Sequence, residues 1–144
     1  MHYIYDDGGR QAAGFKGHTG DCVVRAIAIA TDNRENYRAI YNILYRWQRE
    51  YYAAKPRHWD PSPRNGVSPK VSARYLRMLG WEWTPLLFRN RKEKTHFSVE
   101  NLPKGRLIVS IARHWVAVVD NVILDTYDSS YRRRNIKGYW SRRK

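Results

Sequence analysis

The chain has 144 residues, of which 42% are hydrophobic and 14% aromatic, a composition that supports a buried core and argues against global disorder. Its single cysteine excludes an internal disulfide and a cysteine-rich zinc site. No apolar run approaches the ~20 residues needed to span a bilayer, and the first residues lack the pattern of a signal peptide. We therefore expect a cytoplasmic protein that does not contact a membrane.

The formal net charge of +14 is concentrated in two segments. Residues 55–94 carry ten Lys or Arg against three acids, and residues 131–144 carry seven with no acid. The seven form a basic C-terminal segment, and we take them as candidate anion-binding or nucleic-acid-binding residues: Arg132, Arg133, Arg134, Lys137, Arg142, Arg143 and Lys144. Such clusters favour an anionic partner, namely nucleic acid, an acidic protein or a phosphorylated ligand, although a solvated surface explains them too.

The first element in chain order is a glycine-rich stretch over residues 1–20, which predicts an extended lead-in. Asp21 stands at the N-cap position of a helix over residues 22–30 that is apolar nearly all round, as a buried helix is. Arg25 lies one helical turn from Asp21 and is placed to pair with it.

Two more helices follow. Over residues 35–52 one stripe at helical spacing predicts a buried face, consisting of Tyr37, Ile40, Tyr41, Leu44, Trp47, Gln48 and Tyr51. Residues 55–67, with three prolines, predict a basic loop. Ser68 then opens a third helix with Pro69 just inside it, and Gly80 ends that helix.

After Gly80 the pattern changes to that of strands. The expected strands cover residues 81–88 with an interruption at Pro85, a short piece from residue 95, then residues 107–112, 114–119 and 122–125, and an edge strand over 138–140. Asp120 and Asn121 form the two-residue turn of a hairpin. Helices followed by an antiparallel sheet indicate a single α+β domain over residues 1–144, with N-terminal helices packed on a C-terminal antiparallel sheet.

The candidate catalytic residues are Cys22, His114 and Asp125. A cysteine in the first turn of a helix has a lowered pKa because the unpaired N–H groups and the helix dipole favour the thiolate. A thiol nucleophile needs a base, usually histidine, and a group that orients the base. Residues at equal distances from the hairpin turn pair across the two strands, so Val116 is expected to lie opposite Asp125. His114 is two residues from Val116 and points to the same face, so Asp125 lies diagonally within hydrogen-bonding reach of it.

These segments carry a family resemblance. Residues Gly20-Asp-Cys-Val-Val-Arg25 and His114-Trp-Val-Ala-Val-Val-Asp-Asn-Val-Ile-Leu-Asp125 resemble the papain-like superfamily. The resemblance is to its small bacterial and phage members: double-glycine leader peptidases, CHAP amidases and cell-wall endopeptidases with an Asp-Cys motif. Residues 102–109 and 125–140 also resemble phage-encoded members. The resemblance implies a papain-like fold and thiol hydrolysis or acyl transfer on an amide, in the host cytoplasm for a phage-encoded chain.

One position departs from that family pattern. Papain-like enzymes place a glutamine about six residues before the cysteine, where it completes the oxyanion hole, whereas this chain has Lys16 there. We take His18 and Thr19 as the alternative oxyanion donors, and losing one such donor costs on the order of 10²–10³ in rate. A catalytically weak enzyme is therefore one of the expectations.

Each catalytic candidate also has an ordinary structural explanation. A lone cysteine is more often a small buried apolar residue, a lone histidine a partly buried polar one, and Asp125 a residue that closes a turn. The other histidines show no paired ligand spacing and no glycine-rich phosphate loop is present, so we expect neither a metal nor a cofactor.

Two functions from different classes follow. The first is a thiol peptidase or amidase that acts on an acidic protein or peptide substrate. The second is a weak or inactive papain-like module that binds nucleic acid or an acidic host protein through its basic segments, with Tyr131, Tyr139 and Trp140 available for stacking. The sequence does not indicate the oligomeric state.

Overall fold

The computed structural model describes all residues except 1, 18–19, 54–59, 87–97, 133–134 and 143–144. The described chain contains three α-helices: α1 (Cys22–Ala30), α2 (Tyr37–Tyr51) and α3 (Pro69–Met78). Its strands are β1 (Tyr3–Tyr5), β2 (Trp81–Pro85), β3 (Arg106–Ile111), β4 (His114–Val119), β5 (Val122–Asp125) and β6 (Ile136–Arg142). The expected α+β class is confirmed at this level.

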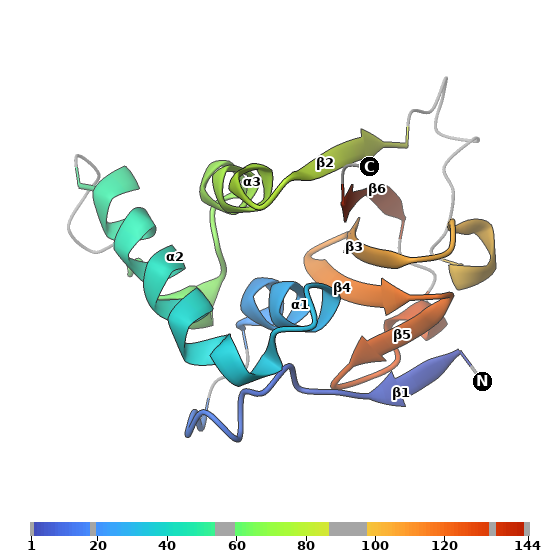
Figure 1. The fold of residues 1–144 in the computed structure, drawn as a ribbon, viewed down its shortest axis with the longest axis horizontal. Coiled ribbons are helices and arrows are strands. Elements are labelled where there is room, and N and C mark those ends of the chain that lie inside the picture. Colours follow the sequence, from blue (N-terminus) through green and yellow to red (C-terminus); the bar gives the residue numbers. More distant parts are fainter. Residues whose placement is uncertain (1, 18–19, 54–59, 87–97, 133–134, 143–144) are drawn as a thin grey trace.

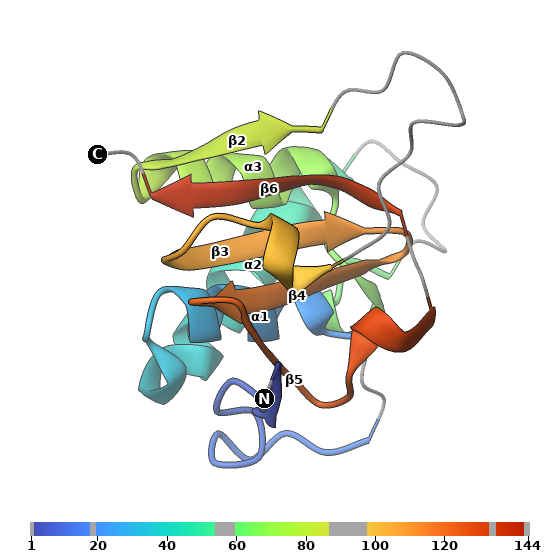
Figure 2. The same ribbon diagram turned by 90° about the vertical axis from the view of Figure 1, so that its right-hand side faces the viewer.

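The six described strands form one mixed sheet in the order β1-β5-β4-β3-β6-β2. Strand β1 pairs with β5 in parallel, and every other neighbouring pair is antiparallel. Figure 2 shows the strands stacked in this order, with β2 and β6 at one end and the N-terminal β1 at the other.

The helices lie on one side of the sheet, and α1 is the one that packs closely against its centre (Figure 1). Residues Val23 to Ala30 of α1 are all buried, as the all-round apolar pattern predicts. Ile108 of β3 and Ala117 of β4 belong to the core shared with the helices. The sheet therefore holds α1, and with it Cys22, against the strand that begins at His114.

A second apolar cluster uses the alternate residues of the same strands. Leu107 and Val109 of β3 and Val118 of β4 contact Val99 and Leu102 from the segment before β3. Because successive side chains of a strand point to opposite faces, this cluster covers the face of the sheet away from the helices. Both faces of the central strands are thus buried.

The helix boundaries agree closely with the sequence. Ser68 caps α3 by accepting the backbone N–H of Lys70 at 3.3 Å, with Pro69 in the first turn, and Gly80 follows the helix with φ of 87°. A short 3₁₀ turn over Arg34–Asn36 precedes α2. The stripe on α2 is buried as expected except at Tyr51, which lies at the exposed last turn and is 41% exposed.

The hairpin that carries the site is confirmed in register. Ala117 pairs with Leu124, Val118 with Ile123 and Val119 with Val122. Asp120 and Asn121 both have positive φ, 48° and 66°, which is the conformation of a two-residue type I′ turn.

Two expectations for the ends of the chain are wrong. The lead-in contains strand β1, whose backbone pairs with β5 from Tyr3 to Tyr5, so the sheet is mixed rather than antiparallel. The expected edge strand over 138–140 belongs to the longer β6, which lies between β3 and β2. Both errors have one cause, because which strands pair over long sequence separations is a tertiary property that local patterns do not carry. The short piece expected from residue 95 falls outside the described residues.

Candidate active site

Cys22 is the first residue of α1 and is partly exposed. Its side chain lines a cleft with a volume of about 490 Å³ that also takes in His114 and Trp115 of β4. The first N–H groups of a helix have no intrahelical partner and attract negative charge, so this position favours a thiolate. Cys22 therefore borders the cleft at the N-terminal end of a buried helix.

His114 is the first residue of β4 and is only 7% exposed. Its Nε2 lies 2.6 Å from Oδ2 of Asp125, the last residue of β5, as the hairpin register predicted. The ring of Tyr127 packs against the imidazole, with 5.2 Å between ring centroids. Since the carboxylate engages Nε2, the other ring nitrogen is the one left to meet the thiol.

The thiol and the imidazole shift each other's titration. Burial raises the pKa of the Cys22 thiol, but a hydrogen bond with His114, the His114 charge and the backbone N–H of Trp115 lower it, and the net pKa lies below the ordinary value. Burial lowers the pKa of His114, whereas hydrogen bonds with Asp125 and Cys22 raise it to about 9. The two directions are those expected of a thiol and an imidazole that stabilise each other's charged form.

The Asp125 carboxylate is held by several donors. Its Oδ1 accepts the backbone N–H of Thr126 at 2.7 Å, and Nη1 of Arg25 lies 3.7 Å from the same oxygen. Arg25 also donates to Oγ1 of Thr126 at 2.7 Å. The oxygen that faces His114 is thereby fixed in direction, which in turn fixes the orientation of the ring.

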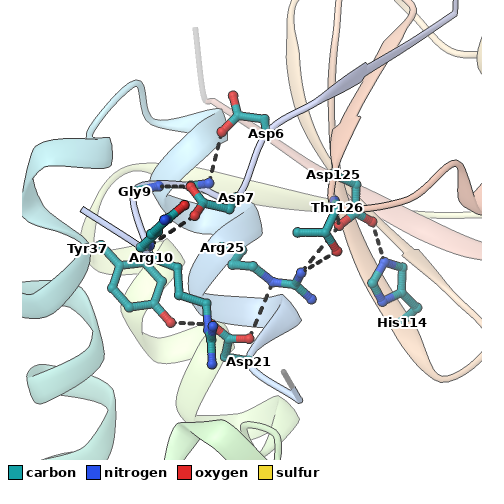
Figure 3. Close-up of polar contacts among 12 residues, drawn as sticks. Asp6, Asp7, Gly9, Arg10, Asp21, Arg25, Tyr37, His114, Asp125 and Thr126 are labelled. Atoms are coloured by element: carbon teal, nitrogen blue, oxygen red, sulfur yellow. Dashed lines mark hydrogen bonds and ion pairs between the residues drawn. The ribbon is translucent and has the colours of Figure 1, made fainter. Parts of the chain in front are cut away.

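Arg25 also contacts a second buried carboxylate, that of Asp21 (Figure 3). Nε of Arg25 lies 3.4 Å from Oδ1 of Asp21, which confirms the expected pairing one helical turn apart. Asp21 Oδ2 is contacted by Nε of Arg10 at 3.2 Å and accepts a hydrogen bond from the hydroxyl of Tyr37. A line of polar contacts thus runs from the lead-in through α1 to the hairpin.

Asp21 occupies the N-cap position as predicted, but its side chain makes no capping hydrogen bond. The carboxylate is fully buried and faces Arg10, Arg25 and Tyr37 instead. Two guanidinium groups and a phenol offset the cost of burying its charge. The roles of Arg10 and Tyr37 were missed, because a contact between segments distant in sequence leaves no periodic signal.

Several of the remaining predicted site residues fall outside the described part of the chain. His18 and Thr19, the expected oxyanion donors, lie outside the described residues, as do Arg133, Arg134, Arg143 and Lys144. The backbone of Arg132 ends a short 3₁₀ helix. Lys137 and Arg142 are exposed at opposite ends of β6, so they belong to the sheet rather than to a tail, and Lys137 also lines the cleft.

Comparison with protein-family models, with curated proteins and with solved structures gave no match for this chain. Among the described residues no helix combines the length and the apolar character required to cross a membrane. The same residues contain no group of three or more His, Cys, Asp or Glu side chains placed to hold a metal ion. The functional argument therefore depends on the geometry of the site.

Proposed function

We propose that the protein is a thiol hydrolase of the papain-like type that cleaves an amide bond through Cys22, His114 and Asp125. One observation carries the proposal: a cysteine at the start of a helix and a histidine bound to a carboxylate line the same open cleft. The lowered pKa of the thiol and the raised pKa of the imidazole support it. A structural cysteine buried among apolar groups would have a raised pKa instead.

The chemistry begins with the Cys22 thiolate attacking the carbonyl carbon of the amide, which forms a C–S bond as an electron pair moves onto oxygen. The backbone N–H of Cys22 at the start of α1 stabilises that oxyanion. The C–N bond then breaks, and His114 gives its proton to the leaving amine, so that a thioester remains on Cys22.

Hydrolysis of the thioester restores the enzyme. Neutral His114 takes a proton from water, and the resulting hydroxide attacks the thioester carbonyl. The C–S bond breaks, Cys22 leaves as a thiolate beside the protonated His114, and the acid product departs. Asp125 holds the ring in one tautomer and stabilises the imidazolium in both steps.

The test uses iodoacetamide at pH ~7, because the single cysteine makes all alkylation report on Cys22. We expect the wild type to be alkylated faster than free cysteine, and His114→Ala to be about tenfold slower, since each unit of thiol pKa changes the thiolate fraction about tenfold. His2→Ala is the matched control, because the His2 side chain is 59% exposed. Alkylation no faster than that of free cysteine and indifferent to His114 contradicts the proposal.

A second candidate function is binding of nucleic acid or an acidic host protein without catalysis. It is favoured by the net charge of +14 and by the exposure of Lys137 and Arg142 on β6. Neutralising phosphates with Lys and Arg makes such binding salt-dependent. Salt-dependent DNA or RNA binding by the Cys22→Ala protein supports this function, and negligible binding at low salt removes nucleic acid as the partner.

A further inference from the structure

The cleft beside Cys22 is lined by positively charged side chains. Three exposed cations from three separate elements line it: Arg77 of α3, Arg113 of the turn before His114, and Lys137 of β6. None of the described residues that line this cleft is acidic. Arg77 also borders a neighbouring pocket together with Glu82, so the charge argument depends chiefly on Arg113 and Lys137.

Arg113 occupies a costly backbone conformation. Its φ is 60°, in the left-handed region that glycine or asparagine adopts with less strain. The turn over Ala112 and Arg113 joins β3 to β4 directly before His114. A long cationic side chain is thus kept at a position where the backbone favours a small one, and that side chain lines the cleft.

The same cleft has an aromatic wall. The rings of Trp83 from β2 and Trp140 from β6 lie 5.5 Å apart between centroids, and both line the cleft together with Trp115. Gly138 makes room for this arrangement, because a Cβ at that position would lie 2.6 Å from Cζ2 of Trp83. Tryptophan faces bind flat apolar side chains and extended peptide backbone.

From these features we propose that the cleft binds a peptide that carries an acidic side chain close to an aromatic or large aliphatic one. The carboxylate contacts Arg113 and Lys137, and the apolar side chain packs on the partly exposed ring of Trp83. Trp140 is only 4% exposed, with the Arg77 guanidinium 5.5 Å from its ring centroid, and supports the Trp83 ring. This assignment depends on the proposed function only in placing the scissile bond at Cys22.

The experiment measures binding by the Cys22→Ala protein, so that no turnover is required. The probe is a fluorescent alanine-based peptide with one glutamate beside one phenylalanine, compared with its glutamine counterpart by fluorescence anisotropy. We expect Arg113→Gln and Lys137→Gln each to weaken binding of the glutamate peptide about tenfold, while binding of the glutamine peptide is unchanged. Trp83→Ala should weaken the binding of both peptides.

The matched control is Arg46→Gln, since Arg46 is exposed on α2, which contributes no residue to the cleft. Equal binding of the two peptides, or no measurable binding of either, overturns the assignment. If Cys22 is alkylated fast but the glutamate and glutamine peptides bind equally, the peptide assignment is wrong and the proposed hydrolase function is still supported. If Cys22 is alkylated slowly but the glutamate peptide binds more tightly, the hydrolase proposal is contradicted and the peptide assignment is supported. An Arg113→Gly protein provides a second variant that the turn accommodates readily.

Discussion

At the scale of single residues, the chemistry of the site is set by Cys22 and His114 together. Burial alone would make the thiol a weaker acid and the imidazole a weaker base. Contact with His114 lowers the thiol pKa, whereas hydrogen bonds with Asp125 and Cys22 raise the imidazole pKa. Each residue contributes to the shifted pKa of the other, so the pair titrates as a unit.

The pH dependence of two reactions separates the roles of the pair. Alkylation needs only the thiolate, so lowering of the Cys22 pKa should keep alkylation measurable at pH values where an ordinary thiol is protonated. Amide hydrolysis also needs the His114 proton for the leaving amine. Because the His114 pKa is raised to about 9, hydrolysis should be retained at neutral pH and lost as pH rises through about 9.

Both profiles are measured on one protein, with alkylation followed by mass spectrometry and hydrolysis by release of a fluorogenic amine from a peptide amide. Hydrolysis that keeps rising above pH ~10 shows that no group with the raised pKa donates the proton. An alkylation rate that follows the titration of free cysteine shows that the Cys22 pKa is not lowered.

The sequence predicted how the candidate catalytic residues are placed, because that placement is local. Cys22 starts a helix whose apolar run is visible, and the hairpin turn sets the diagonal between His114 and Asp125. The lining of the cleft could not be predicted in the same way. Trp83, Arg113 and Lys137 come from three strands or turns that meet only once β6 has inserted between β3 and β2.

At the scale of elements, the segment after β1 is a structured loop that is fixed to the start of α2. Nε and Nη2 of Arg34 donate to Oδ2 of Asp6 at 2.9 Å and 2.6 Å. Gly9 allows the backbone of this loop to lie against the backbone of Arg34, because a Cβ at this position would lie 2.1 Å from the carbonyl oxygen of Arg34. The glycines of the segment that was predicted as an extended lead-in thus allow close backbone packing.

Gly9→Ala should therefore destabilise the fold through a steric clash with backbone. We expect the free energy of unfolding to fall by about 3 kcal/mol, from the left-handed φ of 91° together with the overlap. Gly14→Ala is the matched control: its φ is 86°, and its nearest neighbour is a side-chain nitrogen of Arg38 at 3.5 Å. Urea unfolding measures both variants.

The control should lose only about 1 kcal/mol, the cost of the backbone conformation without the clash. Equal losses at the two glycines show that packing of the lead-in against Arg34 contributes little to stability.

At the scale of the whole molecule, Arg25 connects distant segments of the chain through their polar side chains. It lies between Asp21 before α1 and Asp125 at the end of β5, and its own side chain is 4% exposed. The local half of this arrangement, the pairing with Asp21, follows from helical spacing. The contact with Asp125 across the core does not, because it requires α1 to be packed on the hairpin.

Arg25→Ala should leave two carboxylates buried with less compensation. Removing one partner of a buried ion pair costs about 3–5 kcal/mol, so we expect a fall of that size in the free energy of unfolding. Arg46→Ala, at an exposed position on α2, should change it by no more than about 0.5 kcal/mol. Alkylation of Cys22 should slow in the Arg25 variant, because the Arg25 charge lowers the thiol pKa and Arg25 also helps to hold Asp125 toward His114.

A double-mutant cycle with Asp21→Asn separates the two halves of the contact. If Arg25 and Asp21 stabilise each other, the double variant is more stable than the sum of the single losses predicts, by about 1 kcal/mol or more. The remaining loss then reports on Asp125, the carboxylate that orients the histidine. A loss below about 1 kcal/mol in Arg25→Ala, with unchanged alkylation of Cys22, would show that the buried arginine neither holds the two segments together nor positions the site.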